Sequence, residues 1–156
     1  MPTLATSHFP PPISWEDLEL LVWRLFKSAW NDPYTLMHGR SGQTQHGVDI
    51  YGRPSPGGKW DGIQVKGKYG SFGERVTEQE LRAEVEKAKG FVPPLDNYIL
   101  VTSARRDQQI QQVAREITQE NAESGWFRVT VFAWRTSKSD SQSFPMLWKN
   151  ITLNLT

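Results

Sequence analysis

The sequence predicts an α/β domain in which a central mixed sheet carries helices on both faces. Segments with helical and strand periodicity follow one another in the order helix, hairpin, helix, strand, helix, strand. The final strand, helix and strand form a crossover unit, which implies a parallel pair beside the antiparallel hairpin. The first strand of that unit, "YILVTSA", is continuously apolar, as expected when helices cover both faces of a sheet.

The N-terminal half contributes one helix and the hairpin. Residues 1–13 are rich in proline and are expected to form an extended segment. Ser14 begins a helix that runs to about Trp30, because apolar residues recur at i, i+3 and i+4 and the stop signal "NDP" follows. Residues 47–53 form a strand, "RPSPGGK" a turn and "WDGIQVKGK" the second strand.

The C-terminal half contributes the crossover elements. The capping box "TEQE" at Thr77 opens a helix that runs to about Phe91, where "PPLDN" breaks it. Asp107 begins a helix that Gly125 ends, and "FRVTVFAW" alternates as the last strand. The domain is therefore predicted to span residues 14–135, with residues 136–156 as a C-terminal extension or linker.

The composition excludes several classes of protein. The chain has 156 residues, of which 37% are hydrophobic and 22% charged, so it suits a folded domain with its own core. It has no cysteine, and its three histidines lack zinc-ligand spacing. It contains neither a long apolar run nor a signal sequence, so we expect a cytoplasmic protein without a membrane partner. The net charge of +1 means that any basic surface must come from local clustering.

A lone acid interrupts the first strand of the hairpin. Asp49 lies between Val48 and Ile50, although aspartate is disfavoured in strands. Alternation places Val48 and Ile50 on the face opposite Asp49, and it places Gln64 and Lys66 together. We therefore expect Asp49, Gln64 and Lys66 to converge on one side of the sheet, where they would suit a hard cation and a phosphate.

These strands resemble the D…(D/E)-x-K signature of the PD-(D/E)XK nuclease superfamily. "GVDIYGR" followed by "IQVKGK" looks most like the Mrr-like restriction endonuclease branch, where glutamine often replaces the second acid. The segments "LELLVWRLF", "GRSGQTQHGVDI", "VEKAKGFVPPL" and "ILVTSARRD" are similar to the same branch, which includes defence-associated nucleases of prokaryotes. The resemblance covers residues 13–134.

The resemblance implies a restriction-endonuclease-like three-layer α/β/α fold and an endonuclease that hydrolyses the phosphodiester bonds of double-stranded DNA with Mg²⁺ or Mn²⁺. It further implies a role in anti-phage defence. The catalytic positions that it implies are Glu19, Asp49, Gln64 and Lys66, and the metal-binding positions are Glu19, Asp49, Gln64 and Val65. Lys66 would orient the attacking water and offset negative charge on the phosphate. Further partners would be a second copy of the chain or a fused sensor or oligomerisation module.

Helix geometry favours Glu19 over Glu16 as the helical acid. At about 100° per residue, Glu19 lies at the edge of the apolar stripe and Glu16 lies farther towards solvent. Candidate contacts to nucleic acid surround the two glycine-rich loops, and these residues are Gln43, Gln45, His46, Lys68 and Arg75.

Plainer interpretations remain open for each of these residues. Asp49 could accept a hydrogen bond from a local N–H group, Gln64 could pair with the backbone, and Lys66 could be a solvated strand residue. Acidic residues share the helix that follows Thr77, so its basic residues equally suit a solvated, salt-bridged face. Two other functions also stay open, which are a catalytically inactive nucleic-acid-binding module and a nuclease acting on RNA.

Overall fold

The computed structural model describes residues 14–37, 46–68, 75–105 and 107–134. The predicted N-terminal segment 1–13, the extension 136–156 and the candidate residues Gln43 and Gln45 lie outside these ranges. No helix in the described ranges has the length and apolar character needed to cross a bilayer.

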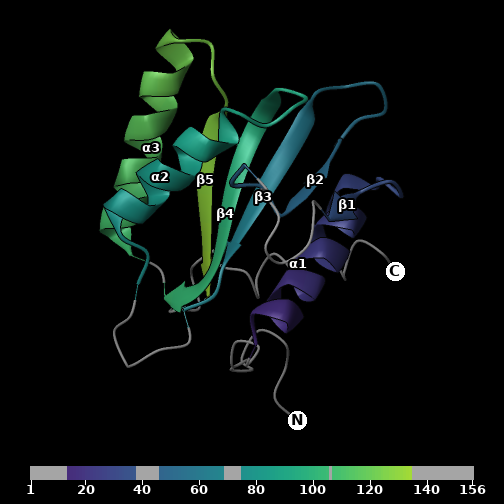
Figure 1. Ribbon diagram of the computed structural model, residues 1–156, viewed down its shortest axis with the longest axis horizontal. Coiled ribbons are helices and arrows are strands. Elements are labelled where there is room, and N and C mark those ends of the chain that lie inside the picture. Colours follow the sequence, from purple (N-terminus) through teal and green to yellow (C-terminus); the bar gives the residue numbers. More distant parts are fainter. Residues whose placement is uncertain (1–13, 38–45, 69–74, 106, 135–156) are drawn as a thin grey trace.

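Three helices and one five-stranded sheet make up the described chain (Figure 1). The helices are α1 (Trp15–Trp30), α2 (Glu78–Ala88) and α3 (Gln108–Glu123). The strands are β1 (Leu36–Met37), β2 (Ile50–Gly52), β3 (Trp60–Lys66), β4 (Leu95–Arg105) and β5 (Arg128–Trp134).

The sheet is mixed, as predicted, with the order β1-β2-β3-β4-β5. The β2–β3 hairpin is antiparallel, and β3–β4 and β4–β5 are parallel pairs. The predicted parallel crossover through α3 is therefore confirmed. Strand β1, which no sequence pattern indicated, pairs antiparallel with β2.

Helices cover both faces of the sheet, so the α/β layering is confirmed (Figure 1). One core cluster packs α2 and α3 against the sheet, and the other packs α1 against the opposite face. Strand β4 contributes to both clusters, since Tyr98 and Leu100 belong to the first and Ile99 and Val101 to the second. This explains why its sequence is continuously apolar.

Local signals fix where the helices begin. The Ser14 side chain accepts a hydrogen bond from the Asp17 N–H group before α1, and Asp107 caps α3 through the Gln109 N–H group. Thr77 and Glu80 form the predicted capping box of α2. Helix α2 ends at Ala88, before the expected end near Phe91, because the chain then turns through Gly90.

Candidate active site at the open edge of β3

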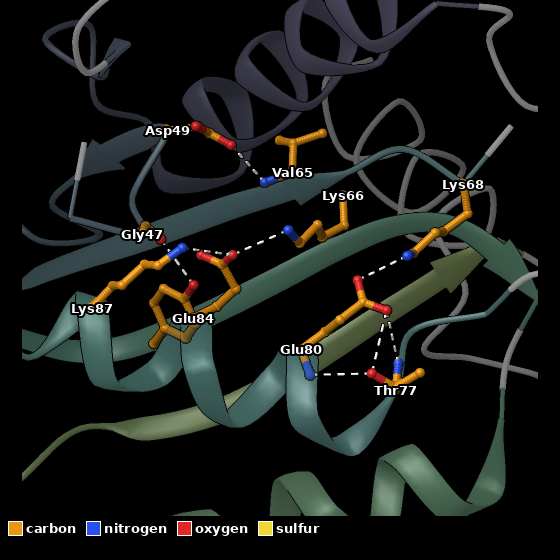
Figure 2. A network of polar contacts seen from close by, with 10 residues as sticks. Gly47, Asp49, Val65, Lys66, Lys68, Thr77, Glu80, Glu84 and Lys87 are labelled. Carbon is orange, nitrogen blue, oxygen red and sulfur yellow. Dashed lines mark hydrogen bonds and ion pairs between the residues drawn. The ribbon is translucent and has the colours of Figure 1, made fainter. Parts of the chain in front are cut away.

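The candidate residues lie where β2 diverges from β3. Strand β2 pairs with β3 only from Ile63 back towards Asp61, so residues 64–66 of β3 extend beyond it. Asp49 lies immediately before β2 and binds β3 through both its main chain and its side chain. Its N–H group donates to the Ile63 carbonyl at 2.7 Å, and its Oδ2 accepts from the Val65 N–H group at 2.8 Å (Figure 2).

The expected alternation around Asp49 is wrong. Val48 packs in the cluster beneath α2 and α3, whereas Ile50 packs in the cluster beneath α1. Both His46 and Gly47 have positive φ angles, of 51° and 66°, so a turn leads directly into Asp49 and regular strand geometry begins only at Ile50. The Asp49 side chain consequently reaches along the edge of β3 instead of pointing over one face of the sheet.

Gln64 and Lys66 take the alternation that β3 predicts. Ile63 and Val65 belong to the cluster on the α1 side, and Lys66 extends to the opposite side, where it contacts α2. Its ammonium pairs with Glu84, and the described contacts include no ion pair between Lys66 and Asp49. The expected convergence of Asp49 and Lys66 on one face is therefore wrong, since the Asp49 carboxylate binds the main chain of β3 and the Lys66 side chain extends towards α2.

Glu19 approaches the same edge from α1. Glu19 is half-buried and Glu16 is exposed, in agreement with the geometry of the apolar stripe. Burial, together with the negative charges of Asp49 and then Glu16, raises the pKa of Glu19 to about 7. The Glu19 carboxylate therefore lies within electrostatic range of Asp49.

Asp49 is almost completely buried, with 2% of its surface exposed. Burial raises its pKa to about 6, although the hydrogen bond from Val65 acts in the opposite direction. The negative charge of Glu84 adds to the increase, and the positive charge of Lys66 opposes it. Lys66 therefore influences Asp49 electrostatically without touching it.

Two buried side-chain oxygens in this region lack hydrogen-bond partners among the described residues. Glu19 Oε2 and Gln64 Oε1 are both buried and have no hydrogen-bond partner within the part of the chain that the structure describes. The same ranges contain no cluster of three or more acidic or histidine side chains placed to hold a metal. Mg²⁺ takes oxygen ligands and keeps several waters, so a site for it needs few protein ligands.

Glu84 is the site residue that the sequence analysis missed. It was grouped with the other acids of its helix as part of a solvated face, yet it is 5% exposed and pairs with Lys66 at 3.0 Å (Figure 2). Its position gave a usable signal. Leu81, Val85 and Ala88 form an i, i+4, i+7 stripe, and Glu84 lies within it.

The candidate nucleic-acid contacts within the described ranges differ in their availability. His46 is exposed in the turn before Asp49. The Lys68 ammonium pairs with Glu80 at 2.7 Å and its side chain is only 14% exposed. Arg75 pairs with Asp107 at 3.4 Å and keeps 66% of its side-chain surface exposed, so it is the more accessible of the two cations.

Comparison with known proteins finds no relative. No protein-family model, no curated protein and no solved structure matches the chain. The chemistry of the β3 edge is therefore the basis for assigning a function.

Proposed function

We propose that this chain is a metal-dependent endonuclease with a restriction-endonuclease-like fold that hydrolyses double-stranded DNA, as an effector of anti-phage defence. The observation that carries the proposal is the meeting of two carboxylates from separate elements, Glu19 and Asp49, at one sheet edge. Both have raised pKa values, chiefly because of burial, and the described contacts include no ion pair with either carboxylate. Buried acids of this kind are frequent in functional sites.

The candidate residues would divide into metal ligands and a catalytic lysine. Glu19, Asp49 and Gln64 supply oxygen ligands, together with the main chain at Val65, to Mg²⁺ or Mn²⁺. A bound cation of this type polarises a phosphodiester and lowers the pKa of a coordinated water. Lys66, at the end of β3, orients the attacking water and offsets the negative charge that develops on the phosphate.

A second function, an inactive nucleic-acid-binding module, is favoured by two observations. Gln64 brings no charge where the resemblance expects a second acid. Asp49 already accepts a hydrogen bond from Val65, which is the structural role that an acid before a strand can have. A nuclease acting on RNA is the third alternative, because the same groups suit both kinds of phosphodiester.

The deciding experiment measures cleavage of supercoiled DNA, linear DNA and RNA with Mg²⁺, with Mn²⁺ and with EDTA. We expect metal-dependent cleavage of DNA, and a loss of at least about 100-fold in Lys66→Met and Asp49→Asn, because each substitution removes a charge on which the transition state depends. Lys59→Met is the matched control, since Lys59 is an exposed lysine whose side chain is 81% accessible and which lies outside the site.

The outcomes separate the three functions. Cleavage of RNA without cleavage of DNA would show that the substrate is RNA and not DNA. Binding of DNA without cleavage under either metal would establish the inactive module. Equal losses in Lys59→Met and Lys66→Met would show that the assay responds to general charge, and the assignment of Lys66 would be overturned.

A further inference from the structure

The ion pair between Lys66 and Glu84 joins the end of β3 to the middle of α2. Lys66 Nζ lies 3.0 Å from Glu84 Oε1, and the two side chains are 29% and 7% exposed (Figure 2). Lys87 reaches the same oxygen at 3.5 Å, but its side chain is 61% exposed. Lys66 is therefore the inner partner of this carboxylate and Lys87 the outer one.

The core and the turn at Gly47 both pack around Glu84. Its neighbours Leu81 and Val85 are buried in the core between α2 and the sheet. The turn that leads to Asp49 also packs against it, since a Cβ atom on Gly47 would lie 2.8 Å from the Glu84 carbonyl oxygen and 3.3 Å from Oε2. The absence of a side chain at Gly47 thus lets the segment carrying Asp49 approach the helix turn that carries Glu84.

A fixed carboxylate restricts the lysine that it binds. A lysine side chain has a flexible four-carbon stem, and its ammonium carries three N–H donors. One donor directed at a buried oxygen of Glu84 confines the ammonium to the end of β3, and the other two donors remain for a water and a phosphate oxygen. Glu84 in turn needs a cation, because a buried carboxylate without a partner is costly.

We propose that Glu84 is a positioning residue, which holds the Lys66 ammonium where the cleavage reaction requires it. This inference rests on the proposed nuclease function, and Glu84 itself contacts neither substrate nor metal in it. Helix α2 becomes part of the catalytic unit through this contact, and the Gly47 turn, which packs against Glu84, leads directly into Asp49.

The kinetic test compares Glu84→Gln with Glu86→Gln. Glu86 is on the same helix and pairs with Lys89 at 2.8 Å, but its side chain is 69% exposed and has no ion pair with Lys66 among the described contacts. We expect kcat to fall about 10- to 100-fold in Glu84→Gln, with KM unchanged, and to stay within about twofold in Glu86→Gln. Adding Glu84→Gln to Lys66→Met should cause no further loss, because both substitutions remove the same contribution.

A second variant and a second measurement keep the inference testable if Glu84→Gln does not fold. Glu84→Asp keeps the charge and shortens the side chain by one methylene, and we expect a smaller fall in kcat. The NMR signal of the Lys66 ammonium in the metal-free protein reports the contact without any activity, and we expect slow proton exchange in the wild type and faster exchange in Glu84→Asp.

The two proposals fail in different ways. If the wild-type chain cuts no nucleic acid, the nuclease function is overturned, and with it the catalytic part of this inference. Slow exchange of the Lys66 ammonium in that chain would still support the contact between Lys66 and Glu84. Cleavage by the wild type with an unchanged or raised kcat in a folded Glu84→Gln variant would overturn the positioning role alone.

Discussion

Asp49 accepts a stabilising hydrogen bond, but its buried negative charge destabilises the metal-free fold. Its Oδ2 accepts a hydrogen bond from the Val65 N–H group, which a neutral amide oxygen could also accept. Its negative charge, in contrast, is buried at the sheet edge, where no ion pair with it is among the described contacts. The charge is therefore a cost to the metal-free fold, and a bound cation would remove that cost.

This conflict predicts how stability depends on pH. Because burial raises the pKa of Asp49 from 3.8 to about 6, the folded state keeps a proton that the unfolded state releases between these values. The free energy of unfolding should fall as the pH rises through this window. With EDTA at about pH 8, Asp49→Asn should gain on the order of 2 kcal/mol over the wild type in urea unfolding, and the gain should vanish near pH 4.

Glu86→Gln serves as the control for this measurement, since an exposed charge should change the free energy of unfolding by no more than about 0.5 kcal/mol. A lower stability of Asp49→Asn at about pH 8 would contradict the prediction. It would mean that the charge of Asp49 strengthens its bond to Val65 by more than burial costs, which is the behaviour of a purely structural acid.

At the scale of elements, two neighbouring ion pairs join α2 to the end of β3 and to the residues that directly follow it. Lys66 pairs with Glu84 at 3.0 Å and Lys68 with Glu80 at 2.7 Å (Figure 2). Residues two apart on a strand are separated by about 6.6 Å and residues four apart on a helix by about 6 Å, so the two repeats match. The strand thereby fixes the helix that carries Glu84.

The start of α2 depends on its capping box. The Thr77 hydroxyl accepts from the Glu80 N–H group at 3.1 Å, and Glu80 Oε1 accepts from the Thr77 N–H group at 3.3 Å. The other carboxylate oxygen of Glu80 accepts from the Lys68 ammonium. Thr77→Ala should therefore lower the free energy of unfolding by about 1 kcal/mol and speed amide exchange in the first turn of α2. Thr77→Ser keeps the hydroxyl and should restore most of the loss, and equal exchange in all three proteins would contradict this role.

The sequence predicted most of these elements because their signals are local. Periodicity and capping residues identified α1, α2 and α3, and alternation with turn residues identified the hairpin. Strand β1 was missed because two residues, Leu36 and Met37, carry no periodicity. The early end of α2 was missed because a helix boundary depends on how the following turn packs.

The residues of the candidate site were chosen by type and spacing, and the orientation of Asp49 was not predicted. Asp49, Gln64 and Lys66 were found from their spacing, yet strict alternation could not anticipate the turn at His46 and Gly47 that redirects Asp49. Glu84 lies in the apolar stripe of its helix, which the sequence shows, but its pairing with Lys66 is a tertiary contact. Such a contact is specified by how α2 packs on the sheet and not by either segment alone.

At the scale of the whole molecule, charge around the site is nearly balanced. The net charge of the chain is +1. Within the described ranges, the lysines nearest the site are paired with glutamates, since Lys66 and Lys87 bind Glu84 and Lys68 binds Glu80. Free phosphate-binding charge is the main source of non-specific DNA affinity, so this face offers little of it without a cation.

DNA binding should consequently depend on metal. We expect the Lys66→Met variant, which does not consume the substrate, to bind a DNA duplex at least about tenfold more tightly with Mg²⁺ than with EDTA at equal ionic strength, a difference of about 1.4 kcal/mol. The physical reason is that the cation would neutralise Asp49 and Glu19, whose charges otherwise repel the phosphate. Fluorescence anisotropy of a labelled duplex measures the two dissociation constants.

Adding Asp49→Asn to this variant should abolish the difference, because it removes a metal ligand while leaving the remaining lysines in place. Equal affinity in Mg²⁺ and EDTA would contradict the prediction and would mean that cations outside this edge, such as the exposed Arg75, hold the DNA without any metal.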